Sequence, residues 1–162
     1  MRVRTGEEMR GVLRWVPLSA LVFGCSALPP PSTPAAPPFN AVVNMKQLMT
    51  WVIDPAADVV WDSVGTIMTE AGTKEVAPHT DEQWDAVRNG AAMLAESGNL
   101  LMIEGRARDP DKWMAAARRL TDAANRALKA AEVRNVDALF ASGEHIYNAC
   151  AACHQRYATH LQ

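Results

Sequence analysis

The chain is poor in cysteine, in β-strand patterns and in basic charge. A structural zinc site needs four ligands, and the only cysteine besides Cys150 and Cys153 is Cys25, for which we expect a different role. Apolar and polar residues nowhere alternate at a period of two, so we expect no strands and therefore no thioredoxin-like redox pair. After Cys25, 16 Asp and Glu outnumber 12 Lys and Arg, which argues against nucleic acid as a partner. No nucleophile with a neighbouring base is evident, so we expect no enzyme.

The most specific motif is Cys150-Ala-Ala-Cys153-His154. It reads C-x-x-C-H, the attachment signature of a c-type haem. On a helix these three side chains lie at i, i+3 and i+4 and share one face. The two thiols can therefore add to the two porphyrin vinyl groups while the imidazole binds iron as the proximal ligand. The motif predicts one covalent haem c held by Cys150, Cys153 and His154.

The N-terminal residues 1–24 have the pattern of a signal peptide, with four arginines followed by a short apolar core. This core is too short to be a permanent membrane span. The sequence Leu21-Val-Phe-Gly-Cys25 resembles a bacterial lipoprotein box, which implies that Cys25 carries lipid and anchors the chain to a membrane. The alternative is an ordinary secreted protein cleaved near Ala27. Both interpretations place the protein outside the cytoplasm, in the periplasm.

Residues 25–39 are rich in proline and predict an extended linker of ~3.1 Å per residue. Such a linker would hold a domain ~30 Å from the membrane surface. We expect the folded domain to span residues 40–162, which is enough chain for a single hydrophobic core.

Four stretches in this domain show the apolar periodicity of helices. Pro55 lacks a backbone donor, so the first helix must kink or restart there after Asp54. Thr80 opens the second helix as a capping box, and Asp109 followed by Pro110 opens the third. The predicted helices span about 41–72, 80–105, 109–131 and 136–159. Amphipathic helices with short connections predict an all-α antiparallel four-helix bundle whose haem lies mainly between the first, third and last helices.

An exported four-helix domain with C-x-x-C-H near its C-terminus resembles the cytochrome c′ family. The run Asp81-Glu-Gln-Trp84, the third helix rich in small residues, and Cys150-Ala-Ala-Cys-His-Gln-Arg-Tyr157 carry the same resemblance. Some members of this family leave the sixth iron position open and bind nitric oxide or carbon monoxide. Others fill it with a methionine of the first helix and carry electrons. The resemblance also implies a tendency to form homodimers.

The segment Lys46-Gln-Leu-Met49 is similar to the first helix of the methionine-ligated members, which implies Met49 as the sixth iron ligand. From the residues alone, Met45 and Met49 share one helix face and either could approach the iron. Both could equally fill the core, leaving the sixth position open. We expect His79, His145 and His160 not to bind iron.

Two functions therefore remain as expectations. The first is electron transport by a membrane-tethered c-type cytochrome with His154 and Met49 on the iron, serving redox partner proteins in the periplasm. The alternative is a gas-binding haem protein with an open sixth position.

Overall fold

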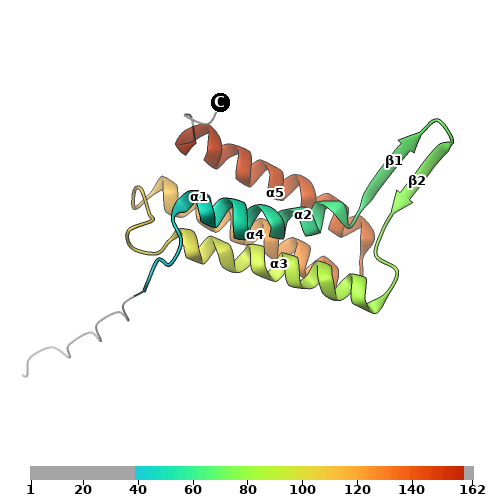
Figure 1. Ribbon diagram of the computed structural model, residues 1–162, viewed down its shortest axis with the longest axis horizontal. Coiled ribbons are helices and arrows are strands. Elements are labelled where there is room, and N and C mark those ends of the chain that lie inside the picture. The colour runs from blue at the N-terminus through green and yellow to red at the C-terminus, as the bar shows by residue number, and fades with distance from the viewer. Residues whose placement is uncertain (1–38, 159–162) are drawn as a thin grey trace, which may run out of the picture. The chain divides into compact units, whose positions relative to one another are not determined.

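The computed structural model describes residues 39–158, which are mostly helical (Figure 1). The predicted signal peptide, the predicted lipid-anchor residue Cys25, most of the predicted linker and His160 lie outside the described residues. The elements are α1 (Met45–Leu48), the π-helical turn η1 (Met49–Ile53), α2 (Asp54–Asp62), β1 (Gly65–Thr69), β2 (Gly72–Val76), α3 (Asp81–Leu101), α4 (Lys112–Glu132) and α5 (Val136–Tyr157).

The elements α1, η1 and α2 follow one another without a break and form the first helical arm. The arm begins later than expected because Asn44 and Gln47 form a capping box. The Asn44 side chain accepts from the amide of Gln47 at 2.9 Å, and the Gln47 side chain accepts from the amide of Asn44 at 3.1 Å. The predicted interruption at Pro55 is present as η1. There the amide of Asp54 donates to the carbonyl of Met49, five residues back.

A β-hairpin follows the arm, so the expectations that the first helix reaches Gly72 and that the chain has no strands are both wrong. The two strands pair antiparallel, with Gly65 opposite Val76 and Thr69 opposite Gly72. Gly72 has φ of 131°, which a side chain would strain, and this favours a tight turn over a helix. Ile67 and Met68 of β1 continue the helical spacing of Val60 and Val64, but both side chains are exposed. Met68, for example, is 81% exposed.

Local signals set the starts of the three long helices. The predicted capping box at α3 is confirmed, since the amide of Gln83 donates to the Thr80 hydroxyl at 3.3 Å. Asp109 caps α4 with one carboxylate oxygen that accepts from three successive amides, at 3.2, 2.6 and 3.0 Å. The helix itself begins at Lys112, two residues later than the motif indicated. At α5 the Asn135 side chain accepts from the amide of Ala138.

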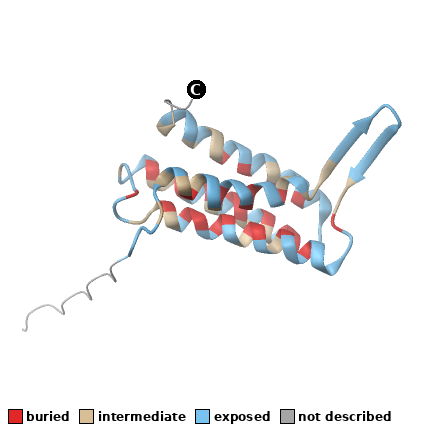
Figure 2. Cartoon of the chain, in the orientation of Figure 1, coloured by how far each residue is buried: buried red, intermediate tan, exposed pale blue. Residues whose placement is uncertain are grey.

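The helices pack in a cycle: the first arm contacts α3 and α5, α3 contacts α4, and α4 contacts α5. Buried residues lie on the faces that the helices turn toward one another, whereas the hairpin is almost wholly exposed (Figure 2). Nine residues of α4 are buried and seven of them are alanine, so neighbouring helices approach it closely. Arg134 at the end of α4 pairs with Asp81 at the start of α3 at 2.6 Å, which shows that these two helices run in opposite directions.

Arg106 ties the start of the first arm to the loop after α3. Its buried guanidinium donates to the carbonyl of Leu100 at 3.1 Å and to that of Val43 at 3.0 Å. A guanidinium is rarely buried without polar partners, so these two bonds fix where the chain enters the helical body. Among residues 39–158, no helix has the length and apolar character needed to cross a membrane.

The contact of α3 with α4 depends on Gly98, and this gives a first prediction. A Cβ at this position would lie 2.9 Å from the Ala117 carbonyl and would collide with the Thr121 hydroxyl, which donates to Ala95. We expect Gly98→Ala to lower the free energy of unfolding by about 1–3 kcal/mol, measured by urea denaturation. Gly65→Ala is the control, because a Cβ there meets nothing within 4 Å. Equal stability of the two variants would contradict close packing at Gly98.

Candidate functional site

The candidate site is a cavity of about 350 Å³ between the first helical arm, α4 and α5. This volume falls within the range of ligand pockets, roughly 300–1,000 Å³. Met49, Cys150, Cys153 and His154 all line it, so the structure brings the four sequence-predicted site residues together. Met45 does not line the cavity and packs against the hydrophobic core instead.

The π-helical turn determines which residues of the first arm face the cavity. A π-turn inserts one residue into the helix, and π-turns are frequent at functional sites. The stripe that begins at Met49 therefore continues through Asp54, Ala57 and Trp61, all of which line the cavity. Pro55 accounts for the turn, because it cannot donate to the carbonyl of Trp51 as a regular α-helix would require.

The wall of the cavity is mostly apolar. Ile53, Leu101 and Leu120 contribute large side chains, while alanines of three helices leave the space open. The ionisable groups that line it are Asp54, His154, Tyr147 and the two thiols. Tyr147 and His154 are exposed, which places them at the rim. An apolar chamber with a few polar groups at its edge is the usual form of a cofactor site.

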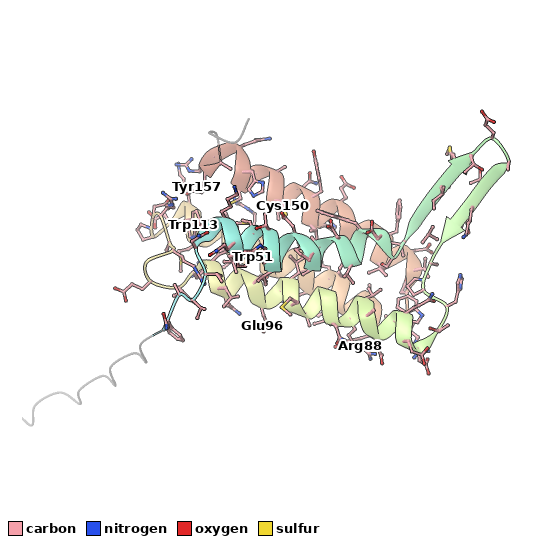
Figure 3. All side chains as sticks on the ribbon, viewed as in Figure 1. Trp51, Arg88, Glu96, Trp113, Cys150 and Tyr157 are labelled. Atoms are coloured by element: carbon pink, nitrogen blue, oxygen red, sulfur yellow. The ribbon has the colours of Figure 1, made fainter. Side chains whose placement is uncertain are left out.

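The two thiols of the motif are free and half-buried. Burial, together with the negative charge of Asp54 and the proximity of Cys153, raises the pKa of Cys150 to about 11. Burial also raises the pKa of Cys153, and the positive charge of Arg119 opposes this shift. Both groups are therefore neutral thiols at pH 7, and Cys150 is visible on the side of α5 that faces the first arm (Figure 3).

A cluster of three side chains fastens the C-terminal end of α5 to the start of α4. The Tyr157 hydroxyl donates to the second carboxylate oxygen of Asp109, whose first oxygen caps α4. The Tyr157 ring meets Trp113 edge-to-face with centroids 4.9 Å apart, and the two are neighbours in Figure 3. The Trp113 indole donates in turn to the carbonyl of Leu101 at 2.8 Å. This cluster holds His154 and Cys153, one turn before Tyr157, over the cavity.

The remaining histidines within the described residues stand apart from the cavity. His145 does not line the cavity and instead lines a surface depression between α4 and α5. His79 is exposed before the start of α3. Among residues 39–158, no group of three or more His, Cys, Asp or Glu side chains lies close enough together to hold a metal ion.

Trp61, Tyr147 and Asp54 are among the cavity residues that were not recognised as such in the sequence. Trp61 and Asp54 could have been found by continuing the stripe of Met49 with one residue added at Pro55. The Trp61 indole also donates to the carbonyl of Gly143 at 3.1 Å, and thereby joins the first arm to α5. The position of Tyr147 follows from the motif itself, since it lies three residues before Cys150 on the same helix face.

Comparisons of the chain with protein-family models, with curated proteins and with solved structures found no match.

The Tyr157–Asp109 contact predicts a dependence of stability on acid. The hydrogen bond from Tyr157, followed by those from backbone amides, lowers the pKa of Asp109 from 3.8 to about 2. A carboxyl with a lowered folded-state pKa stabilises the fold above its unfolded pKa, and this stabilisation is lost as the pH falls from about 4 to about 2. We expect Tyr157→Phe to lower the urea midpoint at pH 6 and to flatten its fall between pH 4 and pH 2.

Asp109→Asn is the stronger variant, because it also weakens the cap of α4. Its urea midpoint should change least with pH over the same interval. If both variants showed the same pH dependence as the unmodified protein, Asp109 would not be the titrating group.

Proposed function

We propose that this protein is an exported c-type cytochrome that carries single electrons. In this proposal residues 40–162 form an antiparallel four-helix bundle that holds one covalent haem c in the cavity between the first arm, α4 and α5. The observation that carries the proposal is the convergence of both cysteines and the histidine of the C-x-x-C-H motif with Met49 on one apolar cavity.

The residues of this cavity fit the demands of a haem. Cys150 and Cys153 would hold it through thioether bonds, while His154 and Met49 would bind the iron from α5 and from the first arm. When bound, a haem supplies a one-electron couple, and a thioether ligand raises its reduction potential. Ile53, Leu101 and Leu120 would surround the haem with apolar side chains, and an apolar surrounding affects its reduction potential.

The cellular setting of the proposal rests on the sequence. The signal-like residues 1–24 and the lipoprotein-like Cys25 support a periplasmic protein tethered to a membrane. Redox proteins of the periplasm would be its partners. In this proposal the haem only carries electrons, so the protein needs no substrate site and is not an enzyme.

The first test is the visible spectrum of the purified protein and of Met49→Ala. We expect the unmodified protein to be low-spin, with sharp ferrous α and β bands and a sulfur-to-iron charge-transfer band in the ferric near-infrared. Met49→Ala should lose that band and become high-spin. Met45→Ala is the matched control and should stay low-spin, because Met45 lies outside the cavity.

Other outcomes would change the proposal in defined ways. A high-spin spectrum of the unmodified protein that shifts on adding carbon monoxide would favour the gas-binding alternative, with Met49 as core filler. A low-spin spectrum that survives Met49→Ala would exclude Met49 as the ligand.

The second test concerns covalent attachment. We expect denatured protein from cells that make c-type cytochromes to retain its haem colour after extraction with acidified acetone. Cys150→Ala combined with Cys153→Ala should release all of it, because both thioether bonds are then absent. A colourless unmodified protein, or colour that is extracted from it, would contradict the proposal.

A further inference from the structure

A shallow groove runs between α4 and α5 and consists of two adjoining depressions that share Arg119 and Ala152. Lys112, Arg119 and Arg126 line it from α4 at intervals of seven residues, so they share one face of that helix. Arg156 lines it from α5. One carboxylate, that of Asp122, lines the groove beside these four cations.

The basic groove stands out against the charge of the rest of the domain. Residues 39–101 carry three basic and nine acidic side chains, whereas residues 102–158 carry nine basic and seven acidic ones. The ion pairs within residues 39–158 are Arg88–Asp85 and Arg134–Asp81, and neither includes a cation of the groove. A row of like charges with a single nearby carboxylate attracts an acidic surface and repels a basic one.

The floor of the groove brings a partner close to the candidate site. It is built largely of alanines, which allow another molecule to approach the helix backbones. Three residues line both the groove and the cavity: Ala116, Ala149 and Cys153. A single layer of side chains therefore separates a molecule in the groove from the contents of the cavity.

The surface of α2, on the other side of the cavity from the groove, carries acidic residues. Asp54 lines the cavity itself, and Asp58 and Asp62 are exposed farther along α2. An acidic partner would be repelled from the α2 side and attracted to the α4–α5 side. The two sides thus favour partners of opposite charge.

We propose that the α4–α5 groove is the docking surface for the acidic face of a redox partner protein, and that electrons pass through its floor at Cys153. This inference rests on the proposed function, because it assigns the partner class of the same cavity.

The first experiment measures binding of a defined acidic probe to the purified full-length protein. A fluorescein-labelled deca-glutamate peptide should bind at low ionic strength, as followed by fluorescence anisotropy, and salt should weaken the binding. Arg119→Glu combined with Arg126→Glu should weaken it about three- to tenfold or more, since two rim charges are reversed. Lys46→Glu combined with Lys74→Glu changes the net charge equally outside the groove and should have less than a twofold effect.

Failure of the peptide to bind, or an equal loss in both double variants, would overturn the docking surface. Binding of phosphatidylglycerol vesicles that depends on Arg119 and Arg126, without binding of the peptide, would overturn it in favour of a membrane contact.

The second experiment follows electron transfer in the holo-protein by stopped flow. Two oxidants of opposite charge, hexacyanoferrate(III) and tris(phenanthroline)cobalt(III), are compared. Each takes one electron from the dithionite-reduced ferrous protein, which becomes ferric. Anionic hexacyanoferrate(III) should react more slowly with the groove double variant, by about three- to tenfold at low salt, and cationic tris(phenanthroline)cobalt(III) should react faster. The Lys46 and Lys74 double variant should show neither change.

The two levels of the proposal fail in different ways. A protein without haem would contradict the proposed function, while the peptide assay would still test the groove. A redox-active haem protein whose rates ignore Arg119 and Arg126 would overturn this inference alone.

Discussion

The missing amide hydrogen of Pro55 is the constraint on which the site depends. A regular α-helix would need that hydrogen for the carbonyl of Trp51, and the π-turn avoids the need by adding a residue. The added residue rotates α2 relative to α1. One face of the arm therefore turns Ala57 and Trp61 toward α5, while Ala56 and Val60 remain in the core. Without this rotation, Met49 and Trp61 would not line the same chamber.

Small residues on α4 make the second contribution. Its alanines permit close contact with α3 on one side, where Gly98 matches them, and they leave open space on the other two sides. The alanines of α4 therefore give tight packing against α3, a cavity toward the first arm and α5, and a groove where α4 and α5 face the surface. Long cationic side chains at seven-residue intervals then distinguish the groove from the cavity.

Much of this arrangement could be predicted from the sequence, and the failures have identifiable causes. The C-x-x-C-H motif and the capping box at Thr80 are local signals, so the start of α3 and the shared face of the motif followed directly, whereas α4 begins two residues later than Asp109 and Pro110 indicated. The hairpin was missed because the residues from Val60 to Met68 also satisfy a helical period. Their true conformation depends on the absence of a neighbouring helix and on the backbone at Gly72. Trp61 was missed because the π-turn shifts the helical register by one residue, and a stripe continued at the regular period does not include that shift.

The position of α5 in the chain has a consequence for assembly. The first arm and α4 precede α5 in the sequence, so a chain made or exported from its N-terminus contains two of the three elements around the cavity before the third is complete. At about 5–20 residues per second, the 22 residues of α5 take roughly 1–4 s to emerge. The helix that bears the cysteines and the histidine also closes the chamber, and the Tyr157 contact with Asp109 forms at its far end. Under the proposed function, attachment of the haem and closure of the cavity would therefore both follow the completion of a single helix.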